Sequence, residues 1–141
     1  MAAASRPMSR LANRGRALRS DSALNPTDQL QRIRVRKYHH LGIPTTEVRA
    51  DERYLADFKV HVSGYDSSPY HIEWMRFDTD CPLPDLVRTV PHVAFEVDDL
   101  DAELAGKQVL IAPNSPSPGV RVAFIVENGA PIEFLQLEPR E

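Results

Sequence analysis

The segment Pro91-His-Val-Ala-Phe-Glu-Val-Asp-Asp-Leu-Asp, residues 91–101, has the pattern of a strand that leads directly into a helix. Successive side chains of a strand point to opposite faces. One face of strand 90–97 therefore carries Val93, Phe95 and Val97, and the other carries His92, Ala94 and Glu96. Asp98 and Asp99 are favoured N-cap residues, and Gly106 is placed to end a short helix over 100–105. We expect this helix to cover the apolar face, with His92 on the opposite face.

Three further strands follow, over 108–112, 120–126 and 131–137, with a loop at 113–119. Asn128-Gly129 joins the last two strands and is a strong signal for a hairpin turn. The order of elements from residue 90 is therefore β-α-β-β-β. The predicted core of this half consists of Val93, Phe95, Val97, Leu104, Ile132 and Phe134.

The first half of the chain resembles the second in order and in sequence. His40-Leu-Gly-Ile matches His92-Val-Ala-Phe, and Ile72-Glu-Trp-Met-Arg-Phe matches Ile132-Glu-Phe-Leu-Gln-Leu. Strands are predicted over 35–45, 60–63 and 71–77, and residues 46–59 show partly helical spacing after a possible N-cap at Thr46. Because this half is shorter, we expect it to lack one strand or hairpin. A proline-containing linker over 78–89 joins the halves.

Alternation along the strands places four chemically active side chains on the face away from the helices: His40, Glu73, His92 and Glu133. Two halves related by a pseudo-twofold axis would bring them together in one concavity. Two imidazoles and two carboxylates can bind a divalent first-row metal and leave positions for substrate. Alternation assigns His39 to the opposite face, where it would either pack in the core or support a neighbouring ligand. His71 is either an additional cavity residue or a rim residue, and Arg76 and Arg121 are weaker candidates for binding an anionic substrate.

These segments, together with Gly119-Val-Arg-Val-Ala-Phe, resemble the glyoxalase, bleomycin-resistance and extradiol-dioxygenase superfamily, whose members are the vicinal oxygen chelate proteins. The resemblance spans about residues 36–138. It implies an α+β fold in which two βαβββ modules, the first one shortened, form a curved mixed sheet that makes a cup. It also implies a divalent metal (Zn, Ni, Mn or Fe) bound by His40, Glu73, His92 and Glu133, and a possible homodimer.

The order His, Glu, His, Glu is similar to that of the glyoxalase I and epimerase branch. The expected function is therefore that of a metal-dependent lyase or isomerase acting on a small carbonyl-containing substrate. In that reaction Glu133 or Glu73 would remove a proton next to the carbonyl. One alternative is a non-catalytic small-molecule-binding protein of the bleomycin-resistance type. It would need an apolar, aromatic-lined groove, of which Trp74, Tyr65 and Tyr70 could supply a part. Another is a ring-cleaving dioxygenase, which would use two histidines and one glutamate and would tolerate loss of Glu73.

Composition and charge restrict the remaining possibilities. The 141 residues carry a net charge of −3, which is distributed unevenly. Residues 1–37 contain nine Lys and Arg and two Asp. Residues 38–141 contain eight Lys and Arg and eighteen Asp and Glu. The acidic remainder argues against a nucleic-acid partner, and no run approaches the ~18 apolar residues of a membrane span. The single cysteine, Cys81, excludes an internal disulfide and suits a cytoplasmic protein. We expect residues 1–34 to be a disordered basic extension and residues 35–141 to be one domain, with modules at about 35–78 and 90–138.

Overall fold

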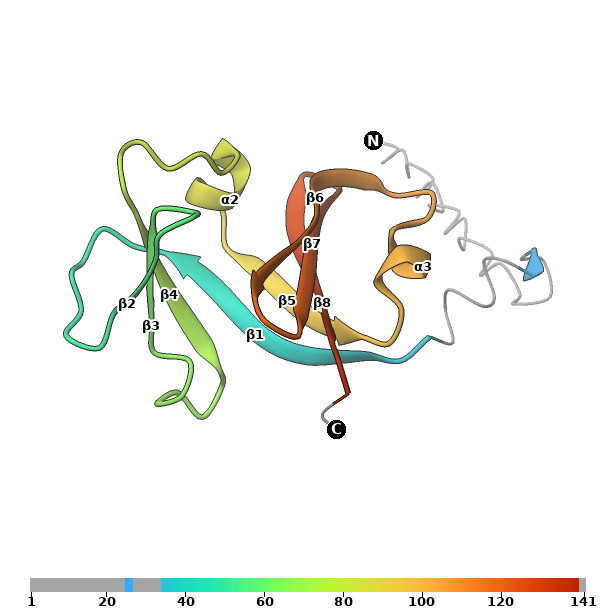
Figure 1. The fold of residues 1–141 in the computed structure, drawn as a ribbon. Coiled ribbons are helices and arrows are strands. Elements are labelled where there is room, and N and C mark those ends of the chain that lie inside the picture. Colours follow the sequence, from blue (N-terminus) through green and yellow to red (C-terminus); the bar gives the residue numbers. More distant parts are fainter. Residues whose placement is uncertain (1–24, 27–33, 140–141) are drawn as a thin grey trace, which may run out of the picture. The chain divides into compact units, whose positions relative to one another are not determined.

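One curved, eight-stranded mixed sheet forms the body of the protein (Figure 1). The structure is a computed structural model that describes residues 25–26 and 34–139. Most of the predicted basic extension, residues 1–34, lies outside the described residues, so its separation from a domain over 35–141 stays a prediction. The elements are β1 (Arg36–Pro44), β2 (Arg53–Leu55), β3 (Val60–Ser63), β4 (Ile72–Phe77), α2 (Asp85–Thr89), β5 (His92–Val97), α3 (Leu100–Leu104), β6 (Gln108–Ser117), β7 (Val120–Glu127) and β8 (Ala130–Leu137).

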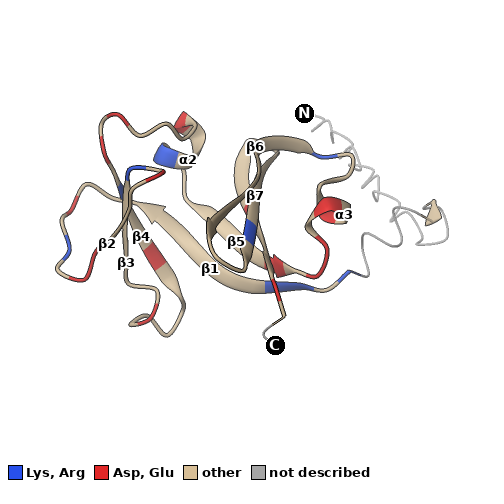
Figure 2. Cartoon of the chain, in the orientation of Figure 1, with Lys and Arg blue, Asp and Glu red and all other residues tan. Residues whose placement is uncertain are grey.

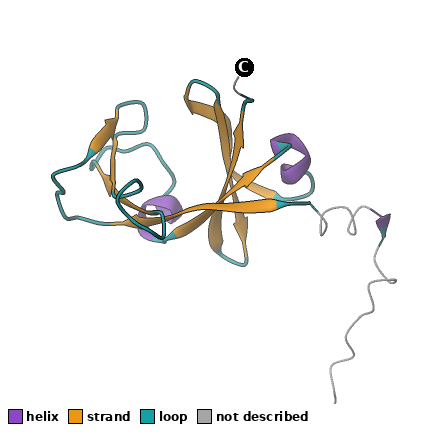
Figure 3. Ribbon diagram, turned by 90° about the horizontal axis from the view of Figure 1, so that it is seen from below, coloured by secondary structure: helices purple, strands orange, loops and turns teal. Residues whose placement is uncertain are grey.

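The strand order shows that the sheet consists of two similar halves. The full order is β2-β3-β4-β1-β5-β8-β7-β6, so β1 and β5 meet at the centre as an antiparallel pair. Each of these two strands pairs in parallel with the last strand of its own half, β4 or β8. Antiparallel pairs complete both wings. The predicted α+β cup of two modules is therefore confirmed, and Figure 3 shows the curvature of its strands.

The first module is shortened by a helix and not by a strand, which corrects our expectation. All four of its strands are present, and the segment predicted to be partly helical, 46–59, contains β2 instead. Val48, one of its apolar positions, is 76% exposed, whereas Leu55 and Phe58 pack against the cluster of β3 and β4. Instead, Arg49 lies over the ring of Trp74, and Glu52 pairs with Arg76, so residues 45–52 cover the outer face of β4.

The linker and the second strand of the second module also differ from prediction. Residues 85–89 form the short helix α2, in which Val87 is fully buried. The helix packs near β1 and β8, on the concave side of the sheet. Strand β6 extends to Ser117 through the predicted loop, with irregular registers opposite β7 at three places. The predicted hairpin at Asn128 and Gly129 is present, with positive φ angles at both residues.

Helix α3 covers the convex face of the second module, as predicted. Asp99 caps this helix by accepting a hydrogen bond from the backbone of Ala102. The buried Glu103 binds Arg36 of β1 and Lys107, and Figure 2 shows the acidic helix and the basic residues of β1. The core beneath α3 contains all the predicted residues except Val93. Its buried members are Val97, Leu100, Ala123, Ile125 and Phe134, and the half-buried Phe95, Leu104 and Ile132 pack against them.

Candidate metal centre

Three of the four predicted ligands meet on neighbouring central strands. His40 of β1 is aligned with Ala94 of β5, and Ala94 is aligned with Glu133 of β8. The Oε2 atom of Glu133 lies 3.0 Å from Nε2 of His40 and 3.1 Å from Nε2 of His92. All three side chains are buried, and one ligand atom from each lies within 4.8 Å of the others. One carboxylate oxygen therefore joins two imidazoles that come from different modules.

A glycine makes room for the His92 ring. Gly42 is aligned with His92 across the β1–β5 pair. A Cβ atom at Gly42 would lie 2.2 Å from Cε1 of His92 and under 3.0 Å from both ring nitrogens. No real Cβ contact is that short, so the observed position of the His92 ring requires glycine at this position. The sequence showed only that this position is small.

The charges of the cluster stabilise one another. Burial would raise the pKa of Glu133, but hydrogen bonds from His40 and His92, with their charges, hold this pKa at about 2. Burial would likewise lower the pKa of His40, but the hydrogen bond and charge of Glu133 outweigh it, and the pKa is raised. Glu133 is therefore an ionised acceptor at neutral pH, which is the state that a metal ligand requires.

A β-bulge brings His39 to the same side as His40, against the prediction from strict alternation. The β1–β5 register shifts between Tyr38 and His40, so His39 is an extra residue on β1. Its Nδ1 lies 2.8 Å from Nδ1 of His40, and its ring stacks on Tyr65 with ring centres 5.2 Å apart. By contrast, Nδ1 of His92 is buried and has no hydrogen-bond partner in the described part of the chain. The pair of adjacent histidines was the only sequence signal for this arrangement.

Glu73, the fourth predicted ligand, lines the same cavity but stands outside the three-residue cluster. It lies on β4, aligned with Gly42 of β1, and it is not among the groups that converge around Glu133. Burial raises its pKa, and the charge of Glu133 acts in the same direction, while His40 opposes them. The two glutamates therefore have pKa shifts of opposite sign, although the sequence repeat made them equivalent.

The cluster opens into a cavity of about 330 Å³ between the two wings of the sheet. Its floor contains His39, His40, Glu73 and Glu133, and its walls are mostly aliphatic. Leu83 and Val87, from the linker and α2, also line it, which the sequence analysis did not foresee. Trp74, Tyr65 and Tyr70, expected to line the groove of a binding protein, do not line this cavity; Phe58 and Phe124 do.

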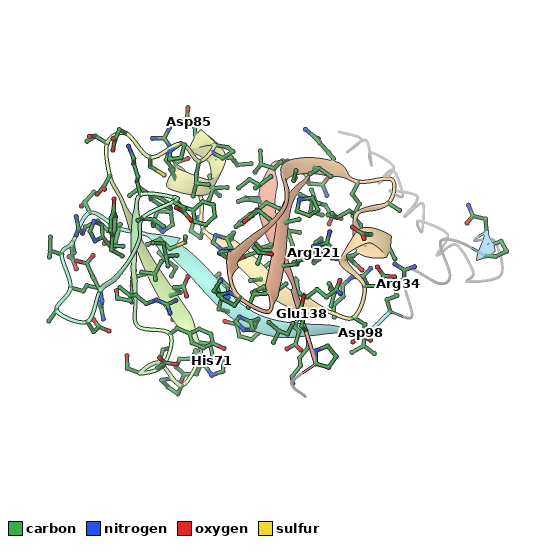
Figure 4. The ribbon with its side chains drawn as sticks, in the orientation of Figure 1. Arg34, His71, Asp85, Asp98, Arg121 and Glu138 are labelled. Atoms are coloured by element: carbon green, nitrogen blue, oxygen red, sulfur yellow. The ribbon has the colours of Figure 1, made fainter. Side chains whose placement is uncertain are left out.

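Several other candidates lie outside the cavity. His71 is exposed and contacts the ring of Tyr65, with ring centres 4.7 Å apart, so it is a rim residue (Figure 4). Arg76 forms two hydrogen bonds with Glu52, and Arg121 of β7 pairs with Asp101. Both arginines thus have carboxylate partners on the protein itself, which explains their presence without an anionic substrate.

Comparison with solved structures identifies the fold. The protein BH1468 of Bacillus halodurans C-125 matches with a TM-score of 0.56 and 18% identity, over 75% of this chain and 97% of that one. Methylmalonyl-CoA epimerase of Mycobacterium tuberculosis matches with a TM-score of 0.53 and 19% identity, over 73% and 89%. The chain has the vicinal oxygen chelate fold. No protein-family model and no curated protein matches the sequence.

In this vicinal oxygen chelate fold, the residues present suit a divalent ion. Ligand atoms held at about 2.0–2.2 Å from one ion lie roughly 3.0–3.6 Å apart, and the Glu133 oxygen lies 3.0 and 3.1 Å from the two imidazole nitrogens. Two imidazole nitrogens and one carboxylate oxygen form a donor set used by Zn, Ni, Mn and Fe. In the described part of the chain, no helix has the length and apolar character to cross a membrane.

Proposed function

We propose that this protein is a divalent-metal-dependent isomerase or lyase that acts on a small carbonyl-containing substrate. The observation that supports this most is the convergence of His40, His92 and Glu133. Two of the three, His40 and Glu133, line the floor of a cavity that also contains Glu73. The fold is shared with methylmalonyl-CoA epimerase, which is an isomerase. The proposal gives the ligand role to the first three residues and the proton-transfer role to the fourth.

The ion would be held by His40 and His92 through Nε2 and by Glu133 through a carboxylate oxygen. When bound, a Zn, Ni, Mn or Fe ion would polarise a carbonyl oxygen and stabilise negative charge that develops on it. Glu133 has a pKa of about 2 and both imidazoles as partners, which supports the role of ligand. We therefore do not assign it the role of base.

Glu73 is the better base for removing a proton from the carbon next to the carbonyl. A carboxylate with a raised pKa accepts and returns a proton more readily near neutral pH than an ordinary one, and burial raises the pKa of Glu73. It lines the cavity beside the cluster without being part of it, so it is free to face the substrate. Of the two candidates for the base, Glu133 and Glu73, we therefore propose Glu73.

Metal uptake and proton exchange test these roles separately. We expect purified protein to bind one Zn, Ni, Mn or Fe ion, and His92→Ala to lose this binding. A panel of small 2-oxo and 2-hydroxy acids and their thioesters, incubated in D₂O, should then reveal deuterium incorporation next to the carbonyl. Glu73→Gln should retain the metal and lose the exchange. If none of the four ions binds, the proposal is wrong and a non-catalytic binding protein replaces it.

One observation favours a second candidate, a ring-cleaving dioxygenase. Two histidines and one carboxylate, with Glu73 outside the cluster, are the donor set of many non-haem Fe(II) oxygenases. This candidate predicts oxygen uptake when catechols are added to the Fe(II)-loaded protein, and none with Zn. Glu73→Gln would leave that uptake intact, whereas it would abolish proton exchange in an isomerase.

A further inference from the structure

Two hydrophobic clusters on the concave face form opposite walls of the cavity. One cluster consists of Val60, Val62 and Met75 of β3 and β4, with Leu55 and Phe58 packed against it. The other consists of Ala94, Val122 and Leu135, with Val120 packed against it. Both clusters contribute to the lining, and the His40 and Glu133 cluster lies on the strands between them. The cavity therefore has a polar floor and two apolar walls.

Charge is scarce away from that floor. Arg53 of β2 is the single Lys or Arg in the lining, and it is exposed. Asn114 and Ser117 of β6 are the uncharged polar residues of the lining. Walls of this kind offer few partners for a polar or multiply charged group, which would lose its water contacts without replacing them. An apolar group would instead remove both its own surface and the walls from water.

We infer that the substrate carries an apolar body, aliphatic or aromatic, that fills the space between the two walls, with a pair of oxygen atoms at the end that faces the floor. This inference rests on the proposed function and adds the chemical class of the substrate. The oxygen pair would meet an ion held by His40, His92 and Glu133, and the carbon next to it would face Glu73. The apolar body supplies most of the affinity, whereas the oxygen pair fixes the orientation.

The chain-length dependence of binding measures this directly. Straight-chain alkyl hydroxamates, from acetohydroxamate to octanohydroxamate, present the same two oxygen atoms with an apolar tail of increasing length. Each added methylene buried against the walls should tighten binding about fourfold, which corresponds to about 0.8 kcal/mol. We expect this gain with zinc-loaded protein in isothermal titration calorimetry until the tail reaches solvent. A flat series would overturn the inference.

A substitution in a cavity wall tests whether the gain in affinity per methylene arises there. Val62→Thr keeps the shape of a wall residue but adds a hydroxyl group, and it should reduce the gain per methylene while acetohydroxamate still binds. Val48→Thr, the same change at an exposed residue outside the cavity, should behave as wild type. If Val62→Thr unfolds, Val122→Thr on the opposite wall replaces it. Equal gains in wall and control variants would overturn the placement of the tail.

Zinc content is measured first on the same samples, because it tests the proposed metal-dependent function separately from the inferred apolar substrate. Protein that takes up zinc but binds all hydroxamates equally contradicts the apolar substrate and leaves the proposed function standing. Protein that takes up none of Zn, Ni, Mn or Fe contradicts the proposed function, and the inference falls with it. Zinc uptake with affinity that rises with tail length supports both.

Discussion

The Nδ1 atoms of His39 and His40 lie 2.8 Å apart, although these residues are consecutive in one strand. An unbroken strand would send their side chains to opposite faces; the bulge at this point of β1 places them side by side. A hydrogen bond between two such nitrogens needs one donor and one acceptor. If Nε2 of His40 holds an ion, its Nδ1 carries the proton, and His39 must accept it.

The first prediction is that His39 sets the metal affinity through His40. Burial lowers the pKa of His39, and the charge of His40 lowers it further, so a neutral, accepting His39 is favoured. His39→Phe keeps a ring to stack on Tyr65 but removes the acceptor, and it should weaken zinc binding about 10–100-fold. Competition with a chromophoric chelator measures this affinity.

His39→Asn is the matched control for that loss. Its side-chain oxygen occupies a position close to that of Nδ1 and can accept the same proton, so most of the affinity should return. Affinities that are lost equally in the Phe and Asn variants would show that the stack on Tyr65, and not the hydrogen bond, matters.

The second prediction concerns the contact between Gly42 and His92. Gly42→Ala introduces a Cβ atom where the His92 ring lies, so the ring must move and zinc affinity should fall by at least tenfold. The free energy of unfolding should also fall, by roughly 1–3 kcal/mol as expected for overpacking.

A double-mutant cycle tests this explanation. In a His92→Ala background the clash is absent, so Gly42→Ala should cost little in urea denaturation. An undiminished cost in that background would place its origin in the β1 backbone instead.

The third prediction is that neutralising the two glutamates changes stability in opposite directions. The pKa of Glu73 is raised by burial, so its charged form destabilises the metal-free folded state at pH values above the ordinary pKa of 4.5. Glu73→Gln should therefore increase the free energy of unfolding at pH 7, and the gain should vanish as the pH falls below about 4.5. Urea denaturation of metal-free protein at pH 4 and pH 7 measures both values.

Glu133→Gln should change the free energy of unfolding in the opposite direction in the same assay. Because the pKa of Glu133 falls from 4.5 to about 2, its charge stabilises the folded protein above pH 4.5, and that stability is lost as the pH falls toward 2. The variant should be less stable than wild type at pH 7, with a smaller difference in acid. Two glutamates with the same sign of effect would contradict their assignment to different roles.

The fourth prediction is that a chain beginning at Arg34 retains the fold and the metal site. All residues that line the cavity lie between His39 and Leu137. Thermal unfolding and zinc content should match those of the full chain. A large drop in either value would mean that residues 1–33 contribute to the folded domain, contrary to the predicted extension.

The sequence was sufficient where side-chain alternation is regular. In β5 and β8 the apolar residues and the residues His92 and Glu133 lie on the predicted faces. The repeat of His and Glu then led to all three side chains of the cluster, His40, His92 and Glu133, and to Glu73 in the same cavity. The α+β cup and the hairpin at Asn128 followed from the same local patterns.

The sequence was insufficient where the backbone is irregular or where tertiary strand pairing outweighs the local sequence pattern. The bulge at His39 adds one residue without changing composition, so alternation assigned that side chain to the wrong face. Residues 53–55 pair with β3, which prevents the helix that their neighbours' spacing suggested. Helix α2 has only five residues and follows a stretch that contains Pro82 and Pro84, which is typical of a loop. Its formation depends on the packing of Val87. The homodimer and the cytoplasmic location stay predictions.

The candidate ligands are divided unequally between the modules, since His40 comes from the first and His92 and Glu133 come from the second. Neither half by itself holds a complete set of donors. An ion bound at the floor would fasten the two central strands together as a non-covalent cross-link, and its binding free energy would add to the work of separating them. Metal availability would then govern how cooperatively the two halves melt, so that one small ion couples the chemistry of the cavity to the lifetime of the folded chain.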